Sequence, residues 1–477
     1  MKLELEKYWL YRNRHSVGMA LVFVILGFFI IWGFDRLPIG LSEFEMQSAA
    51  LSGNISFPES IVDLPYHFLQ WLSIGFFGLS QFSIRLPSVI LAFFGGIFIM
   101  GGIRNLTKNN VAIITGLVIS SSVFFLDFAR IGAPMIMNIF LFSLTIFSLT
   151  QYLFKNRRNV IWLVLAIAAI ILETYSPLGI YTLLALLLLS IAHPKARLFI
   201  AKIKLWHKLL LLGLLLIVMA PMVYAAILSP SIIPDLLGIG QFQIAPAEIG
   251  NSFQVLFNPS GTEFAGLATP LINFVELALM ALGIVALVKN RQSIRSYLTL
   301  GLAALTLVFA LADITKSYLL FLPMIFLIAF GVQEIINRWY GLFPFNPYAR
   351  FLGLVPILIL VSSLTFSNYA LYVSDELYDK DVVYGQSLVF SVVKETVNDL
   401  SAHDVNLVVS NDELDFYRLL EKDYPNLKVR TEIERSAETK ILIPSTFEKN
   451  YAIPNLAKFS NTADKNVLVK IYQNSVK

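Results

Sequence analysis

Apolar stretches of about 18 residues recur along most of this 477-residue chain. An α-helix rises about 1.5 Å per residue, so a stretch of this length spans about 27 Å, close to the hydrocarbon thickness of a bilayer. Hydrophobic residues make up 57% of the chain and charged residues 14%, which is more apolar than a soluble core of this size requires. The sequence therefore predicts an all-α polytopic membrane protein.

Eleven segments fit this pattern. The first follows a basic N-terminal stretch and precedes no small-residue cleavage site, so we interpret it as a signal anchor. The predicted spans are 17–34, 83–103, 111–126, 134–154, 160–173, 177–192, 208–228, 270–288, 296–312, 317–334 and 351–370.

The basic residues distinguish the two sides of this arrangement. If the N-terminus is inside, nineteen Lys and Arg residues lie in inner segments and four in the outer loops before residue 371. An excess of Lys and Arg in cytoplasmic loops is the usual pattern of multi-pass proteins. We therefore expect a multi-pass protein of the plasma (cell inner) membrane with its N-terminus in the cytoplasm and its C-terminal end outside.

The composition changes after residue 370. The segment 371–477 holds 13 basic and 17 acidic residues, as expected for a soluble domain. It offers no metal, phosphate or nucleophile motif, so a packing, acceptor-binding or partner-docking role is expected. We predict a transmembrane domain over 1–370 and a small extracytoplasmic α/β domain over 371–477. The latter has β-type runs starting at Val405, Asn426, Lys440 and Asn466, and helical patterns at 385–400 and 413–422.

Two predicted outer loops are long, at 35–82 and 229–269. The first contains LPYHFLQWLSIGFFGLS, from Leu64, which is too short and too interrupted by polar residues for a span and is typical of a helix lying at the membrane interface. Long loops on one face of a compact domain usually carry function. The active face is therefore expected outside.

The first of these loops opens with two carboxylates in the stretch GLSEFEMQSA, from Gly40. Ser42 and Glu45 have the spacing of a capping box, in which each side chain accepts from the other residue's backbone N–H. Glu43 is left over. It can relieve the positive end of the helix dipole, or it can act as the base of an enzyme, with Glu45 as the second candidate.

Three cations lie at the outer ends of predicted spans: Arg85, Arg130 and Lys316. Each can snorkel to the interface, and together they suit a substrate that carries a phosphate at the membrane surface. Asp127 precedes Arg130 by three residues, which predicts a helix-spaced ion pair between them.

Other ionisable groups give weaker signals. Glu276 falls inside a predicted span, where an acid is a candidate site by default. The five histidines show no ligand spacing and the chain has no cysteine, so we assign no metal site and no cofactor, although a divalent ion stays possible without a motif to support it. No nucleic-acid partner is expected.

The order of these segments resembles the polytopic GT-C glycosyltransferases, in particular the branch containing protein mannosyltransferases and the aminoarabinose transferase of lipid A. The resemblance covers roughly residues 15 to 370 in layout. It is carried by the segments Leu64 to Ala92 (LPYHFLQWLSIGFFGLSQFSIRLPSVILA), Ala129 to Met137 (ARIGAPMIM) and Lys316 to Met324 (KSYLLFLPM), and by the similarity of Asn406 to Asp423 to the outer tail of bacterial relatives.

The resemblance implies transfer of a sugar from a polyprenyl-phosphate carrier to a lipid, glycan or protein acceptor on the outer face. A carboxylate takes the acceptor hydroxyl proton while cations hold the departing phosphate. Glu43 is the first candidate for that base. The candidate donor phosphate ligands are Arg85, Arg130 and Lys316.

The chain departs from the family pattern at four charged positions. Ser42 and Ala133 stand where the family has Asp, and Leu64 and Tyr175 where Lys is usual. This pattern keeps open a second interpretation, a catalytically degenerate relative that binds lipid-linked glycans or acts as a scaffold subunit. A transporter or flippase is less favoured, because charged residues inside the predicted spans are nearly absent and no inverted repeat is evident.

Overall fold

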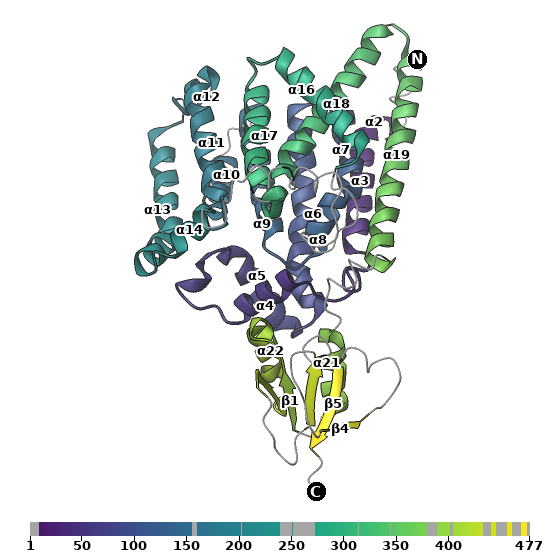
Figure 1. The fold of residues 1–477 in the computed structure, drawn as a ribbon. Coiled ribbons are helices and arrows are strands. Elements are labelled where there is room, and N and C mark those ends of the chain that lie inside the picture. Colours follow the sequence, from purple (N-terminus) through teal and green to yellow (C-terminus); the bar gives the residue numbers. More distant parts are fainter. Residues whose placement is uncertain are drawn as a thin grey trace.

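The protein is described by a computed structural model that covers residues 9–154, 160–201, 203–238, 250, 272–312, 314–343, 345–378, 389–400, 404–432, 440–444, 456–459 and 469–474. Most of the loop predicted at 229–269 lies outside these residues. The apolar part consists of long helices that run roughly side by side in a bundle and of shorter helices at its ends (Figure 1). They are α2 (Trp9–Arg12), α3 (Arg14–Ile31), α4 (Glu43–Gly53), α5 (Leu64–Phe77), α6 (Gln81–Leu106), α7 (Asn109–Ser121), α8 (Val123–Arg130), α9 (Met135–Phe154), α10 (Val160–Glu173), α11 (Gly179–Ala192), α12 (Pro194–Ala201), α13 (Leu205–Leu228), α14 (Ile232–Leu237), α16 (Phe274–Lys289), α17 (Ile294–Ala312), α18 (Phe321–Leu342) and α19 (Pro347–Tyr378), with 3-10 turns η1 (Glu59–Ile61) and η3 (Ile314–Leu320).

Each of the eleven predicted spans contains a helix, but not every helix is long enough to cross a membrane. Within the described residues, seven helices pass by length and composition, and an eighth does if the bent pair α7 and α8 is one span. The helices α10 and α11 have 14 residues each, about 21 Å at the usual rise. The polytopic helical architecture is thus confirmed, while the number of eleven spans stays a prediction.

The third predicted span, at 111–126, is broken. The helices α7 and α8 meet at Ser122 with a bend of 59°. Just before the bend, the hydroxyls of Ser120 and Ser121 donate to the carbonyls of Gly116 and Leu117. Such bonds compete with the helical ladder and favour bending. Because of the bend, the axis of α8 differs in direction from that of α7. Arg130 lies at the C-terminal end of α8.

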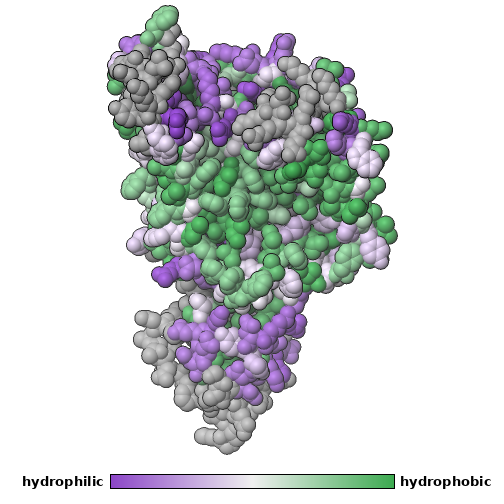
Figure 2. Space-filling view, turned by 180° about the vertical axis from the view of Figure 1, so that it is seen from behind, coloured by the Kyte–Doolittle hydropathy of each residue, from purple (hydrophilic) through white to green (hydrophobic). Residues whose placement is uncertain are grey.

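An apolar belt covers the middle of the bundle on the face shown in Figure 2. Figure 2 shows hydrophobic side chains over its middle and hydrophilic ones at one end of the bundle and on the C-terminal unit. The N-terminal helix begins at the end of the bundle away from the C-terminal unit (Figure 1). Exposed apolar side chains on this belt include Leu188, Ile217 and Phe366. Such a continuous apolar surface is what a bilayer would cover.

Two glycines allow a close helix crossing between α16 and α18. A Cβ on Gly331 would overlap the carbonyl oxygen of Leu279, and a Cβ on Gly283 would overlap the carbonyl oxygen of Leu327. Small residues that let two backbones approach are typical of membrane helix pairs. This contact fixes α18, the most deeply buried of the long helices.

We expect Gly331→Ala to lower the free energy of unfolding by about 1–3 kcal/mol, because the added methyl group must push the two backbones apart. Gly301→Ala is the matched control, since no atom lies within 4 Å of its Cβ position. The measurement is the midpoint of thermal unfolding of each purified variant in the same detergent. Equal midpoints for the two variants would contradict a backbone-limited crossing.

The C-terminal unit is a five-stranded sheet with strand order β2-β1-β3-β5-β4. The strands β2, β1 and β3 are parallel, and β5 and β4 add as antiparallel strands. The four β-type runs and two helical patterns seen in the sequence are present, and β4 adds a short strand that no pattern indicated. The elements are α21 (Val389–Asp399), β1 (Val405–Val408), α22 (Asn411–Asp423), β2 (Leu427–Arg430), β3 (Lys440–Pro444), β4 (Leu456–Phe459) and β5 (Val469–Asn474).

This unit and the loop that carries α4 share one apolar core. The helices α4 and α5 lie across the end of the bundle, with α22 beneath them (Figure 1). Lys394 Nζ donates to the carbonyl of Leu79 at 2.6 Å, and Lys422 Nζ to that of Gly53 at 3.3 Å. The shared core contains Leu41, Met46, Ala49, Leu79 and Ile84 from the loop side and Phe390, Val393, Phe416, Leu419 and Leu420 from the C-terminal unit.

Candidate functional site

The start of α4 confirms the predicted capping box. The backbone N–H of Ser42 donates to Glu45 Oε2 at 2.9 Å, and the backbone N–H of Glu45 donates to Ser42 Oγ at 3.3 Å. Both bonds satisfy groups that a helix start leaves without partners. Glu45 is buried, with 1% of its surface exposed. Its burial points to a second partner beyond the cap.

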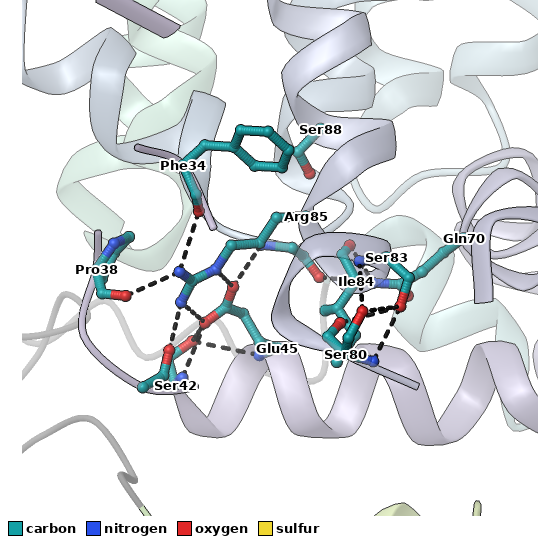
Figure 3. A network of polar contacts seen from close by, with 12 residues as sticks. Phe34, Pro38, Ser42, Glu45, Gln70, Ser80, Ser83, Ile84, Arg85 and Ser88 are labelled. Atoms are coloured by element: carbon teal, nitrogen blue, oxygen red, sulfur yellow. Dashed lines mark hydrogen bonds and ion pairs between the residues drawn. The ribbon is translucent and has the colours of Figure 1, made fainter. Parts of the chain in front are cut away.

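That partner is Arg85, near the start of α6. Its Nε donates to Glu45 Oε1 at 2.7 Å and its Nη2 to Glu45 Oε2 at 3.0 Å, and both side chains are fully buried. Nη1 donates to the carbonyls of Pro38 and Phe34, and Nη2 also to that of Gly40 (Figure 3). Every guanidinium nitrogen of Arg85 therefore has a protein acceptor. The pair holds the loop before α4 against α6.

Glu43 lies on a different face of α4. Its side chain is exposed and accepts from Gln47 Nε2 at 3.1 Å. Burial raises the pKa of Glu413, on α22, and the negative charges of Asp412 and Glu43 raise it further. The carboxylate of Glu43 is therefore close to the C-terminal unit and apart from the buried Glu45–Arg85 pair.

Arg130, at the end of α8, is buried and incompletely bonded. Its Nη2 donates to the carbonyls of Phe29 and Trp32, at the end of α3, at 2.5 and 2.8 Å. Its guanidinium carbon lies 5.2 Å from the centroid of the Tyr372 ring. Its Nε and Nη1 have no hydrogen-bond partner among the described residues. Two buried guanidinium nitrogens thus have no acceptor in the described part of the chain.

The predicted ion pair between Asp127 and Arg130 is not formed in the described structure. Asp127 is 2% exposed and its Oδ2 has no partner there. The reason is that α8 ends at Arg130 and the guanidinium turns to the carbonyls of α3. The prediction from helix spacing was wrong because it assumed that the side chains point along one helix face.

A second charged group forms around Asp63, which precedes α5. Asp63 is 9% exposed, and its Oδ1 has no partner among the described atoms. Its backbone is left-handed, with φ 54°, and its N–H donates to the carbonyl of Tyr175 at 2.9 Å. A non-glycine residue in this region is uncommon and marks sites that their surroundings hold in place.

The chemistry of Asp63 depends on three segments that meet there. Burial raises the pKa of its carboxyl to about 6, an effect partly offset by hydrogen bonding from Ser176 and by the positive charge of Lys316. Ser176 lies in the turn after α10, and Lys316, half-buried, lies in η3. Of the predicted phosphate ligands, Lys316 is therefore near the buried Asp63, as Arg85 is near the buried Glu45.

Asp63 was not singled out as a candidate from the sequence. The local signal was an acid directly before Leu-Pro at the start of a helix, with Pro65 in its first turn. That signal alone predicts a helix start, because acids and proline are common there. Only the contacts with Tyr175, Ser176 and Lys316 distinguish Asp63 from a cap.

Glu276 has a structural explanation. The helix α16 begins at Phe274, so Glu276 lies in its first turn, where its side chain accepts from the N–H of Asn273 and completes a capping box. The expectation that it lies inside the span, about two turns from the start, was wrong, because the helix begins only at Phe274. Among the described residues, no group of three or more His, Asp or Glu side chains is arranged to hold a metal ion.

The chain is similar to known membrane glycosyltransferases. Residues 64–224 match the family described as dolichyl-phosphate-mannose-protein mannosyltransferase. No curated protein sequence gives a significant match.

The fold matches solved structures of low sequence identity. ArnT from Cupriavidus metallidurans in the apo state has a TM-score of 0.57 at 14% identity, covering 96% of this chain and 98% of that one. The same protein bound to undecaprenyl phosphate gives 0.54 at 13% identity over the same shares. The apo oligosaccharyltransferase of Archaeoglobus fulgidus gives 0.51 at 12% identity, covering 88% and 65%. The family match and the shared fold confirm the resemblance predicted from the sequence, that of a polytopic membrane protein of the GT-C glycosyltransferase type.

Proposed function

We propose that this protein transfers a sugar from a polyprenyl-phosphate donor to a lipid, glycan or protein acceptor at the end of the bundle that carries α4 and α5. The observation that supports it most directly is the buried guanidinium of Arg130, whose Nε and Nη1 have no partner among the described residues. An unpaired buried cation costs several kcal/mol relative to water, so such a group is retained where a ligand completes it. A phosphate oxygen is the acceptor that a guanidinium binds best.

The comparisons support a lipid phosphate as this ligand. ArnT, which shares the fold, was solved with undecaprenyl phosphate bound, and the family matched by residues 64–224 is described by its use of dolichyl-phosphate-mannose. Both molecules carry a phosphate on a long apolar chain, and in the second the mannose is attached to that phosphate. The apolar belt of the bundle suits the lipid chain of such a donor, and Arg130 suits its phosphate.

The transfer step needs a base for the acceptor hydroxyl. In our proposal Asp63 takes this proton, the hydroxyl oxygen attacks the anomeric carbon of the sugar, and the bond from that carbon to the donor phosphate breaks. The phosphate keeps the electron pair and is held by Arg130 and Lys316, and in-line attack inverts the anomeric centre. Glu43, the base first expected, is exposed beside Glu413 and lacks such surroundings.

The proposal revises two of the expected roles. Glu45 and Arg85 bind each other and the loop before α4, so we assign them to holding that loop in place and leave the donor phosphate to Arg130 and Lys316. The proposed orientation keeps the N-terminus inside and the α/β unit outside, in agreement with the distribution of basic residues.

We expect Arg130→Met to lower kcat/KM for the lipid-linked donor by about 10- to 100-fold, the effect of losing a charge-assisted hydrogen bond. Arg36→Met is the control, because the side chain of Arg36 is 87% exposed. A deletion strain, complemented with each variant, is compared by the mass profile of its surface glycans and glycolipids. The mass lost from that profile identifies the sugar. The value of kcat/KM for the corresponding lipid-linked donor is then measured with purified protein in proteoliposomes.

The outcomes separate the two functions left open by the sequence. A sugar-sized loss restored by wild type and Arg36→Met, and poorly by Arg130→Met, supports the transferase. Full restoration by Arg130→Met would contradict the proposal that Arg130 binds the donor phosphate. No loss on deletion, and no transfer by purified protein with any donor, would favour the degenerate scaffold, which the mutual engagement of Glu45 and Arg85 also permits.

A further inference from the structure

Gln70, on α5, makes hydrogen bonds to three other segments of the chain. Its Oε1 accepts from the hydroxyls of Ser48 and Ser52, both on α4, at 2.9 and 2.7 Å. Its Nε2 donates to the carbonyls of Ile84, on α6, and Gly132, after α8, each at 3.0 Å. The side chain is fully buried. All four hydrogen-bonding positions of the amide are therefore used within the protein.

The two backbone carbonyls determine which way this amide points. Because the carbonyls of Ile84 and Gly132 can only accept, they must face Nε2, which leaves Oε1 to accept from the hydroxyls of Ser48 and Ser52. Figure 3 shows Gln70 reaching toward Ile84 from the side of α5. A side chain fixed in this way can hold a backbone carbonyl in one position.

The peptide at Gly132 is held from both sides. Its carbonyl accepts from Gln70 Nε2, and its N–H donates to Glu45 Oε1 at 2.9 Å. A Cβ at this position would lie 2.8 Å from the carbonyl oxygen of Ile84, so the backbone also packs closely against α6. The helices α4, α5 and α6 together fix this one residue.

Gly132 follows Arg130 by two residues, directly after the end of α8. We infer that Gln70 is a positioning residue for Arg130. By holding the Gly132 carbonyl, it fixes the turn from which the Arg130 side chain projects, and so fixes where the unpartnered Nε and Nη1 meet a donor phosphate. This inference rests on the proposed function and adds a residue that touches neither donor nor acceptor.

Gln70→Met keeps the length of the side chain and removes all four bonds, and Gln70→Glu keeps the acceptors and removes the two donors. Gln47→Met, an exposed glutamine on α4, is the matched control. The first measurement is hydrogen exchange of the peptide containing residues 128–134. We expect faster exchange in both Gln70 variants and no change in the control. Unchanged exchange would overturn the inference without affecting the proposed function.

The second measurement is binding of undecaprenyl phosphate to the purified variants. We expect about tenfold weaker binding for Gln70→Met, and little further loss when it is combined with Arg130→Met, because residues that act through one another are not additive. Losses that multiply would mean a purely structural role and overturn the positioning role. Wild-type protein that binds no undecaprenyl phosphate would overturn the proposed function itself, whatever the exchange data show.

Discussion

Asp63→Asn is expected to lower the rate of sugar transfer by about 10²- to 10⁴-fold, the usual contribution of a general base. Asparagine has nearly the same shape and also tolerates a left-handed backbone, so the strained turn at residue 63 is kept. The amide cannot take a proton from an acceptor hydroxyl. The variant should therefore stay folded and bind undecaprenyl phosphate while transferring almost nothing.

The comparison with Glu43→Gln decides between the two candidate bases. Glu43 is exposed and bonded to Gln47, so its loss should change the transfer rate by less than about twofold, as for most surface substitutions. The rates are measured with the same donor in proteoliposomes, with thermal unfolding as the check on folding. If Asp63→Asn left the transfer rate unchanged and Glu43→Gln abolished transfer, Glu43 on α4 would be the base and Asp63 would not.

The pH dependence supplies an independent signature. Since burial raises the pKa of Asp63 to about 6, the ionised form that can accept a proton is lost as the pH falls through this value. The transfer rate of the wild type should decline below about pH 6 and be flat above it. The residual activity of Asp63→Asn should lack this decline. A wild-type profile without any loss near pH 6 would contradict the role of Asp63.

Arg85→Met is expected to destabilise the protein by about 3–5 kcal/mol, because it leaves the carboxylate of Glu45 buried and uncompensated. The carbonyls of Pro38 and Gly40 lose their donors as well. Glu45→Met should be comparably harmful, since it leaves the guanidinium unpaired. The double variant should be less destabilised than the sum of the two, because neither charge is then left without its partner.

A second ion pair provides the control for this experiment. Arg338 and Glu334 are joined at 2.8 Å, nearly the same distance, but their side chains are 58% and 24% exposed. Such a pair contributes about 0–1 kcal/mol. The loss of stability on unfolding in the same detergent is compared for Arg338→Met and Arg85→Met. The difference between the two losses measures the effect of burying the ion pair. Equal losses would mean that the Glu45–Arg85 pair does not hold the loop.

Local patterns in the sequence predicted the elements well. The capping box of Ser42 and Glu45 needs only a three-residue spacing, and the apolar segments need only composition over a helix length. The bend between α7 and α8 was not predicted, although the sequence shows Ser120 and Ser121, whose hydroxyls bond to the backbone just before it. Serines inside an apolar run do not show whether they bond to their own backbone or to a neighbouring helix.

The candidate site was less predictable, because it depends on contacts between distant segments. Glu45 and Arg85 are 40 positions apart, and nothing in either neighbourhood shows that they bind each other. The same holds for Asp63, whose surroundings come from Tyr175, Ser176 and Lys316. Hydrophobic periodicity determines that helices pack, but it does not determine which polar residues meet at their ends.

The core shared by α4 and the C-terminal unit has a consequence for biosynthesis. The apolar side chains of Met46 and Ala49 are covered by Phe416 and Leu419, residues that a ribosome reaches long after it has made α4. During that interval the long helices from α6 to α19 are synthesised while α4 lacks its cover. The loop that carries α4 is therefore among the last parts of the molecule to complete its packing.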